Sequence, residues 1–511
     1  MAVKTFASID IGSYELELKI YEISTKAGIR EIDDVRHRLD LGKDTFRIGH
    51  ISAELLEDMI RVLKDFTEIM EGYEVSAYRA IATSAVREAS NHVNILDQIR
   101  QKVGIDVTVL SNSQQRFLGY KAIASKQADF SKIIENATAI VDLGGGSLQL
   151  SFYDKDSFVT TKSISWGFVR IREVLSKIGN ETSDEALVVE ELINEDIRNF
   201  RRLYLPDRKV KNIIAVGDYI NYIMKKASKS PDKSYVTREE FLELFKILEH
   251  KNNESLAEFL EMPYENAGFV LPSAIVYKKL IEELGAEMIF TPGITIGDGL
   301  VYDYADTRKL IRTGHDFDED IIASARNIGK HYKSDKYHIQ AVESYAIQIF
   351  DRMKKIHGLG NHEKLLLRLA IQLHDCGKYV DFRNVAKCSY EIILFTEIIG
   401  ISREERTLIA NVVGCQSLPF QEIHRLSETV DRKSYLLIEK LATIFRVANS
   451  LDTSHKQKIT KFSTDIRDDK LRIHVTTSSD FTFEKGIFAM NKELFQEVFG
   501  IELELKVRKN V

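Results

Sequence analysis

Cysteine is scarce in this chain of 511 residues, and membrane-type sequence is missing from it. The three cysteines, Cys376, Cys388 and Cys415, form an odd and sparse set without CxxC spacing. Such a set excludes a disulfide framework and a cysteine-based zinc site. No run of about 18 apolar residues predicts a membrane span, and the N-terminus lacks the basic and apolar segments of a signal peptide. We therefore expect a cytoplasmic protein without a membrane partner.

A strong charge of one sign is also lacking. The chain carries 71 Lys and Arg against 77 Asp and Glu, a net charge of −6. A non-specific nucleic-acid binder is usually more basic, so nucleic acid is not an expected partner. A polyanionic substrate would need a local basic cleft rather than a global field.

An internal duplication organises the first part of the chain. Residues 4–23 alternate between apolar and polar positions, which predicts two strands joined by a turn at Gly12 and Ser13. The segment ATAIVDLGGGSLQLSFY (137–153) repeats this device: an apolar strand, an aspartate, glycine and a second alternating strand. Two such hairpins from two similar α/β subdomains are typical of the actin, Hsp70 and sugar-kinase architecture. In that architecture the hairpins grip a phosphate chain between them.

The later segments predict different folds. Helical spacing extends over about 52–72, 91–102, 184–203 and 237–261, and beyond residue 315 the pattern is almost entirely helical until strands return at 460–508. Since one core stops growing at about 250–300 residues, several domains are expected. We predict an actin-like (ribonuclease H-like) duplicated α/β core, an all-α domain and a small α+β C-terminal domain. The boundaries lie near residues 130, 310 and 460, which gives the domains 1–130, 131–310, 311–459 and 460–511.

The two predicted turns have the chemistry of a phosphate site. Glycine lets backbone N–H groups approach an anion, because no Cβ intervenes. Asp10 and Asp142 end their strands just before the turns, where carboxylates can hold Mg²⁺, and Ser13 and Ser147 can donate to phosphate oxygens. The alternative is that each glycine only forms a tight hairpin. Two copies in matching contexts favour the phosphate site.

Four segments resemble the exopolyphosphatase / guanosine pentaphosphate phosphatase (Ppx/GppA) family. DIGSYELEL, ATSAVREASN (82–91), VDLGGGSLQL and SISWGFVRIRE (163–173) are similar to the family's DIGSNSxRL, ATSAxRxAxN, DIGGGSTEL and SLPLGAVRLTE. They follow the family's order over the first 310 residues. The resemblance implies a Mg²⁺ site at Asp10 and Asp142. It also implies the phosphate-binding residues Gly12, Ser13, Arg87, Gly144, Gly145, Gly146 and Ser147.

The catalytic positions depart from the family pattern. The glutamates of the family's SGxEEA are Gln114 and Gln115 in SNSQQR, and the glutamate of GGGSTEL is Gln149. These glutamines, with Asp142, are the catalytic set that the resemblance implies. Glutamine cannot accept a proton at neutral pH, and general-base catalysis contributes about 10²–10⁴ in rate. Because some GTPases orient water with glutamine, the site could be slow rather than inactive.

A second set of residues resembles an HD-type metal site. His338 and the pair His374-Asp375 are similar to the opening of metal-dependent phosphohydrolases, and the resemblance continues through LATIFRVANSLDTSH (441–455). The later aspartate ligand is replaced by Asn449, and Cys388 and Gln416 stand at histidine positions of related exopolyphosphatases. We expect no catalytic metal at His338, His374 and Asp375, but a buried, hydrogen-bonded pair. In the family this helical domain helps to hold polyphosphate and to pack a homodimer.

Two functions remain open from the sequence. The first is Mg²⁺-dependent hydrolysis of terminal phosphoanhydrides in polyphosphate or guanosine pentaphosphate. The second is a catalytically degenerate regulatory protein that binds polyphosphate or an alarmone such as guanosine tetraphosphate. A sugar or acetate kinase of the same architecture fits less well, because such kinases end at about the second subdomain.

Overall fold

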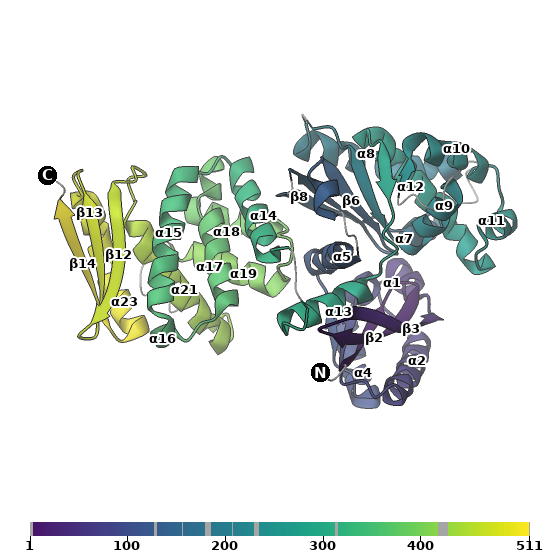
Figure 1. The fold of residues 1–511 in the computed structure, drawn as a ribbon, viewed down its shortest axis with the longest axis horizontal. Coiled ribbons are helices and arrows are strands. Elements are labelled where there is room, and N and C mark those ends of the chain that lie inside the picture. The colour runs from purple at the N-terminus through teal and green to yellow at the C-terminus, as the bar shows by residue number, and fades with distance from the viewer. Residues whose placement is uncertain are drawn as a thin grey trace. The chain divides into compact units, whose positions relative to one another are not determined.

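The computed structural model describes residues 4–126, 130–155, 157–178, 185–206, 208–228, 235–311, 315–416 and 428–509. The chain divides into two compact units, Met1–Asp316 and Phe317–Val511, and each is described by itself (Figure 1). In the part of the chain that is described, no helix has the length and apolar composition to cross a membrane.

The first unit opens with a five-stranded sheet in the order β3-β2-β1-β4-β5. The pairs β1/β2 and β2/β3 are antiparallel, whereas β4 runs parallel to β1 and β5 runs parallel to β4. The strands are β1 (Lys4–Ile11), β2 (Glu15–Ser24), β3 (Gly28–Arg38), β4 (Ala77–Ala82) and β5 (Val107–Val109). β1 and β2 confirm the predicted hairpin.

The second sheet of this unit repeats the first. Its order is β10-β11-β9-β6-β7-β8, so β8-β7-β6-β9-β11 matches the order of the first sheet and β10 is added at the edge. Its strands are β6 (Thr138–Leu143), β7 (Leu148–Asp154), β8 (Ser157–Ile164), β9 (Asn212–Val216), β10 (Tyr235–Thr237) and β11 (Met288–Phe290). The predicted duplication and the actin-like core are thereby confirmed.

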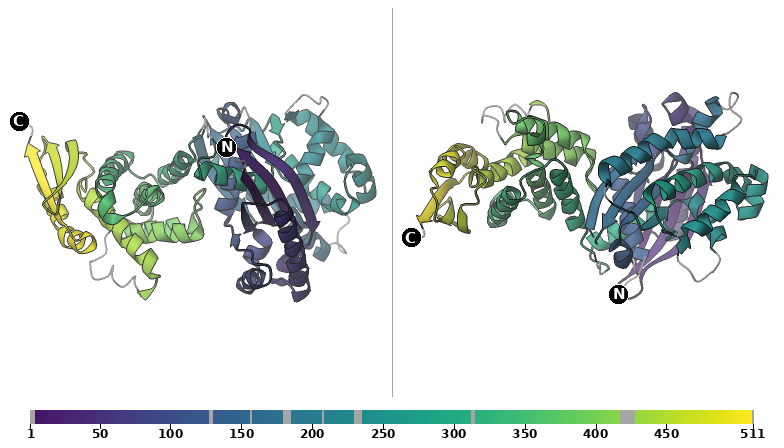
Figure 2. Two further views of the ribbon diagram at one scale, coloured as in Figure 1. Left: turned by 60° about the horizontal axis from the view of Figure 1, so that its bottom comes forward. Right: turned by 90° about the horizontal axis from the view of Figure 1, so that it is seen from above.

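Helices cover both faces of the first sheet (Figure 2). One face packs on α2 and α4 through aliphatic residues of β1 and β2. The opposite face packs on α5 and α13 through Phe6, Tyr21 and Tyr304. The helices of this part are α1 (Leu41–Ile48), α2 (Ala53–Gly72), α3 (Ser84–Glu88), α4 (His92–Val103), α5 (Asn112–Lys126) and α13 (Ile296–Thr307).

The second sheet carries the larger apolar core, which includes strand residues of β6 and β7 and residues of α7, α8 and α12. The elements here are α6 (Phe130–Ile134), α7 (Phe168–Ile178), α8 (Glu185–Tyr204), α9 (Asp218–Ala227), α10 (Arg238–Leu248), α11 (Asn253–Leu260), η1 (Tyr264–Phe269) and α12 (Val270–Leu284). The helical spacing expected over 237–261 corresponds to α10 and α11, which are separated by a turn at 249–252, and the Asn252 side chain caps α11 by accepting a hydrogen bond from Ser255 N.

The last helix of the first unit returns to the first sheet. α13 packs against α5 and β1, although it lies within the range 131–310 that the sequence assigns to the second subdomain. We call the first sheet with α1–α5 and α13 the first lobe, and the second sheet with its helices the second lobe. The range 131–310 therefore holds the second lobe together with one helix that packs on the first.

The second unit joins a helical bundle to a small sheet. The helices are α14 (Phe317–His331), α15 (Lys336–Arg352), α16 (Lys354–His357), α17 (Asn361–Leu373), η2 (Cys376–Tyr379), α18 (Val385–Phe395), α19 (Arg403–Gly414) and α21 (Arg432–Ser450). The sheet has the order β12-β13-β14, with strands β12 (Ile459–Arg467), β13 (Lys470–Thr477) and β14 (Glu502–Lys509). α22 (Thr482–Ala489) and α23 (Lys492–Phe499) connect the last two strands, and the sheet is drawn in yellow in Figure 2.

We expect Gly299→Ala to destabilise the first unit. Gly299 is where α13 meets α5 backbone to backbone, and an added Cβ would lie 2.7 Å from the carbonyl carbon of Leu118. Overpacking of this kind costs about 1–3 kcal/mol. Gly119→Ala on α5 is the control, because nothing lies within 4 Å of its added Cβ and a helical Ala gains about 0.5–1 kcal/mol over Gly. Urea unfolding of both variants measures the difference, and equal stabilities would contradict the packing.

Candidate functional site

A pocket of about 150 Å³ lies in the first unit where the two glycine turns meet. Its wall includes residues from β1, β2, α5, β6 and the start of α13. Of the residues predicted from the sequence, the lining contains Asp10, Gly12, Ser13, Gln115, Asp142, Gly144, Gly145 and Ser147. Arg87, Gln114, Gly146 and Gln149 do not belong to the lining.

The two turns are built alike. Gly12 N donates to Glu15 O and Gly144 N donates to Ser147 O, each at 3.0 Å. The carbonyl of the next residue in each turn accepts a hydrogen bond from the backbone N–H of the second residue of a helix. Ser13 O accepts from Gly42 N of α1 at 2.7 Å, and Gly145 O accepts from Val169 N of α7 at 2.9 Å. The duplication therefore extends from the sheets to the individual hydrogen bonds of the site.

The turns approach so closely that side chains are excluded between them. A Cβ on Gly145 would lie 2.8 Å from Ser13 Cβ, which real Cβ atoms do not tolerate. A Cβ on Gly146 would lie 2.7 Å from Ser84 Cβ, and the hydroxyls of Ser13 and Ser84 are 2.9 Å apart. The prediction that the two hairpins face each other across a cleft is confirmed.

Tyr14 crosses from the first turn into the second lobe. Its ring belongs to the apolar core of that lobe and meets Phe269 edge to face with centroids 4.6 Å apart. Its hydroxyl donates to Glu265 O at 3.3 Å, and the Arg38 guanidinium lies 4.9 Å from the ring centroid. The pKa of Tyr14 is raised because burial disfavours the phenolate. Tyr14 thus attaches one lobe to the other beside the pocket.

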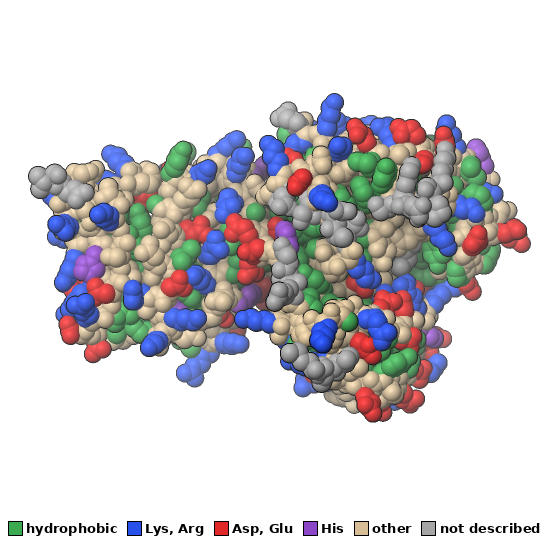
Figure 3. All heavy atoms as spheres, in the orientation of Figure 1, with side chains coloured by type: hydrophobic (Ala, Val, Ile, Leu, Met, Phe, Trp, Pro, Cys, Tyr) green, Lys and Arg blue, Asp and Glu red, His purple; other side chains and the backbone are tan. Residues whose placement is uncertain are grey.

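The pocket wall is acidic. Asp10, Glu15, Glu17 and Asp142 line it, and none of the described lining residues is Lys or Arg. The nearby Arg170 and Arg172 bind carboxylates instead, because Arg170 contacts Glu88 at 2.6 Å and Arg172 contacts Asp40 at 2.7 Å. Figure 3 likewise shows basic side chains interspersed with acidic ones on the face in view. An anion in this pocket would therefore need a cation beside it.

Arg87 is directed toward the start of α5. Its Nη1 donates to Leu110 O and its Nη2 donates to Asn112 Oδ1, both at 2.6 Å. These bonds fix the loop that leads to Gln115. In this arrangement the guanidinium supports a wall of the pocket.

The three glutamines have different surroundings. Gln114 caps α5, since its Oε1 accepts from Ser111 N at 3.1 Å. Gln115 lines the pocket, and its buried Oε1 has no hydrogen-bond partner within the described residues. Gln149 stands opposite Asp142 across β6 and β7, is 2% exposed, and its Oε1 is equally unpartnered in the described part of the chain.

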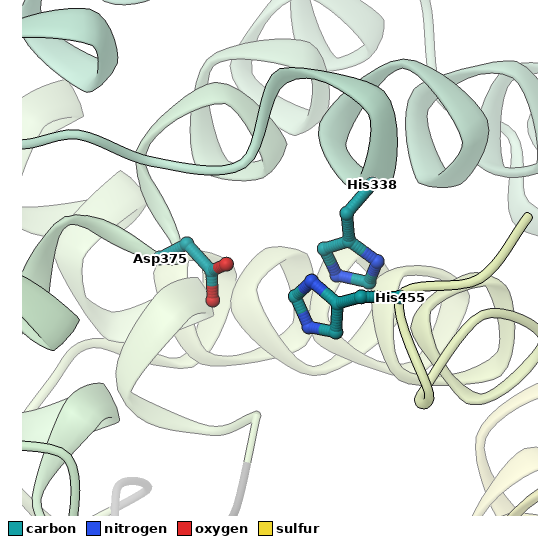
Figure 4. Close-up of side chains that lie close together, drawn as sticks. All are labelled: His338, Asp375 and His455. Atoms are coloured by element: carbon teal, nitrogen blue, oxygen red, sulfur yellow. The ribbon is translucent and has the colours of Figure 1, made fainter.

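A second cluster of titratable side chains lies in the helical bundle of the second unit. His338 on α15, Asp375 after α17 and His455 offer ligand atoms within 4.8 Å of one another (Figure 4). The rings of His338 and His455 stack with centroids 3.6 Å apart. His338 Nδ1 lies 2.9 Å from Asp452 Oδ2, so this carboxylate orients the ring. The sequence pattern had assigned no role to Asp452 or His455.

His374 points into the same cluster as a neutral ring. Burial lowers its pKa to about 4. Its Nδ1 donates to Ile371 O at 2.7 Å, which leaves Nε2 3.3 Å from His338 Nε2. The expected burial and hydrogen bonding of His374 and Asp375 are confirmed, since both residues are buried, His374 bonds Ile371 O and Asp375 accepts from Lys378.

A lysine supplies the positive charge of this cluster. Lys378 Nζ donates to Asp375 Oδ2 at 2.7 Å and lies 3.2 Å from His455 Nε2. Burial opposes ionisation of Asp375, yet the pKa of that carboxyl is lowered, and the Lys378 ammonium that it contacts contributes to the lowering. The cluster does not fit a divalent cation as it stands, because the ammonium already contacts two of the three ligand groups.

Comparison with known proteins matches both units. Residues 20–308 match the model of the Ppx/GppA phosphatase family, and residues 322–497 match domain III of Ppx/GppA phosphatase. A Ppx/GppA family member from Aquifex aeolicus has a similar fold, with 21% identity, a TM-score of 0.51, and coverage of 62% of this chain and 100% of its own. An exopolyphosphatase from Cytophaga hutchinsonii shows 17% identity, a TM-score of 0.52, and coverage of 61% and 100%. At this level of identity these two structures support the fold alone.

We expect Lys378→Met to create a divalent-cation site. Removal of the ammonium leaves the carboxylate of Asp375 and the imidazoles of His338 and His455 without a cation, and these are ligand types that Zn²⁺ prefers. Metal analysis after dialysis against Zn²⁺ should find about one equivalent more in the variant than in the wild type, by ligand count.

The matched control is Lys440→Met, which removes a lysine of the same unit whose ammonium donates to His357 O. It should gain no metal, and adding His455→Ala to Lys378→Met should abolish the gain. A wild type that holds Mn²⁺ or Fe²⁺ and loses it in His374→Ala would show that the lysine does not displace the metal.

Proposed function

The chain belongs to the Ppx/GppA phosphatase family, and on that premise we propose that its pocket hydrolyses the terminal phosphoanhydride of polyphosphate or guanosine pentaphosphate. The observation that carries the proposal is the pair of matching glycine turns around one pocket. Phosphoryl transfer depends on positioning and electrostatic stabilisation, and polar groups on two rigid turns would serve both.

The proposed phosphate contacts come from backbone and hydroxyl groups. The glycines Gly12 and Gly144–Gly146 leave room for an anion, and Ser13 and Ser147 line the pocket beside them. Arg87 contributes by holding the start of α5, or by turning its guanidinium from Leu110 O to a bound phosphate. Bidentate contacts of this kind suit a phosphate group.

The lining fits Mg²⁺. Its donors are carboxylate oxygens and the amide oxygen of Gln115, which has no hydrogen-bond partner among the described residues; this is the hard oxygen set that Mg²⁺ prefers. Asp10 and Asp142 would hold the ion, which when bound neutralises charge on the phosphate oxygens. Because the wall has no basic lining residue among those described, polyphosphate binding should depend on a divalent cation.

A second function is favoured by the three glutamines. A phosphatase scaffold with amides at Gln114, Gln115 and Gln149 could bind polyphosphate or an alarmone with little turnover. Phosphate release from polyphosphate with and without Mg²⁺ separates the two functions. Calorimetric titration of polyphosphate, ATP and guanosine tetraphosphate against one preparation identifies the anion. A preparation that binds none of them and releases no phosphate would rule out both.

We expect the triple variant Gln114→Glu, Gln115→Glu and Gln149→Glu to raise phosphate release by about 10²–10⁴, the range of general-base catalysis. The gain is smaller if the natural glutamines already orient water, or if another carboxylate of the pocket already accepts the proton. The exchange keeps the side-chain shape, and the unpartnered Oε1 atoms of Gln115 and Gln149 lose no hydrogen bond within the described structure.

Gln98→Glu is the control for added charge, since Gln98 lies on α4, away from the pocket lining, and its amide oxygen accepts from Lys102. It should leave the rate unchanged. Thermal melts of all variants accompany the assay. A triple variant that is less stable and no faster would show that the pocket has adapted to the amides, because unpaired buried charge is costly.

A further inference from the structure

The duplicated hairpins differ at one pair of equivalent positions. In the first lobe, Asp10 on β1 stands directly opposite Glu17 on β2. In the second lobe, Asp142 on β6 stands directly opposite Gln149 on β7. Directly opposed side chains of an antiparallel pair lie on the same face of the sheet. The first lobe therefore carries a carboxylate where the second carries an amide.

Glu17 belongs to the pocket. It lines the wall together with Asp10 and Asp142, and its side chain is only 6% exposed. Gln149, by contrast, does not line the pocket. Of the two equivalent positions, only that of Glu17 on β2 places a carboxylate at the pocket.

The surrounding structure fixes the direction of the Glu17 carboxylate. Arg36 on β3 contacts Oε1 at 2.7 Å. On the other side, the first turn of α13 comes so close that a Cβ on Gly297 would lie 3.4 Å from Oε2 and 2.6 Å from Ser8 Oγ. A buried carboxylate held by strand and helix is a preorganised group, as catalysis requires.

Arg36 would stay in place without the Glu17 carboxylate, because it has two further carboxylate partners. The Arg36 guanidinium also contacts Glu15 at 3.1 Å and Asp34 at 3.2 Å. Two partners therefore remain if Glu17 loses its charge. A purely structural role predicts little effect of such a change.

We propose that Glu17 accepts the proton of the attacking water. Positions 114, 115 and 149, where the family pattern has glutamate, carry glutamine and cannot take this role. The inference rests on the proposed hydrolytic function. The water oxygen forms a bond to the terminal phosphorus, the bridging P–O bond breaks, and the shortened phosphate chain leaves with the electron pair. The water proton passes to the Glu17 carboxylate and afterwards to solvent.

The test is phosphate release from polyphosphate in the presence of Mg²⁺, with polyphosphate binding measured by calorimetry on the same proteins. Glu17→Gln keeps the shape and should lower turnover by about 10²–10⁴. Its affinity should be unchanged or tighter, because a negative charge is removed beside a polyanion. Glu17→Asp keeps the proton acceptor and should retain more turnover than Glu17→Gln. Glu31→Gln, on the same sheet and paired with Lys19, is the control with unchanged turnover.

The outcomes separate the inference from the proposed function. If the wild type hydrolyses polyphosphate and Glu17→Gln does so equally fast, Glu17 is not the acceptor and the hydrolase remains. If turnover falls only because binding weakens in parallel, the proton-transfer role is also overturned. A wild type that releases no phosphate overturns the proposed hydrolysis, and the role of Glu17 with it. Melting temperatures confirm that each variant is folded.

Discussion

The close contact between the two glycine turns is the constraint on which the pocket depends. Gly145 lies against Ser13, and Gly146 lies against Ser84, with no room for a Cβ at either position. The turns are held by equivalent hydrogen bonds to α1 and α7, so each lobe presents the same rigid edge. A side chain at either glycine would force the lobes apart, and the strand-end aspartates would no longer share one pocket. The duplicated hairpins can thus form one common pocket only because glycine occupies this contact.

The charge of the lining side chains determines the charge of a ligand that the pocket can bind. Four carboxylates line it, while the neighbouring arginines are already paired with Asp40 and Glu88. In the second unit the buried carboxylate of Asp375 is balanced by the ammonium of Lys378, which donates a hydrogen bond to it. In the first unit the proposed Mg²⁺ would balance the carboxylates, whereas in the second unit the balancing cation belongs to a side chain. Buried negative charge is stable only when it is paired, and Lys378 provides such a pair in the second unit.

Local patterns predicted the parts of the fold that depend on neighbouring residues. The alternation in residues 4–23 and 137–153 gave both hairpins, and the repeated aspartate and glycine gave their pairing across a cleft. The sequence could not place Arg87, because the bonds to Leu110 O and Asn112 Oδ1 depend on how a distant loop packs. It also missed Glu17, Tyr14 and Lys378 as members of their sites. For Glu17 a signal was present, since it follows Asp10 at the spacing at which Gln149 follows Asp142.

The burial of Tyr14 has a consequence for motion between the lobes. Its ring belongs to the apolar core of the second lobe, although the residue follows the first glycine turn and lines the pocket. The lobes can move apart at the pocket only if this ring leaves that core and gives up its edge-to-face contact with Phe269. Such a movement exposes a buried aromatic ring to water, so the free energy of burying one side chain favours the closed arrangement of the two turns.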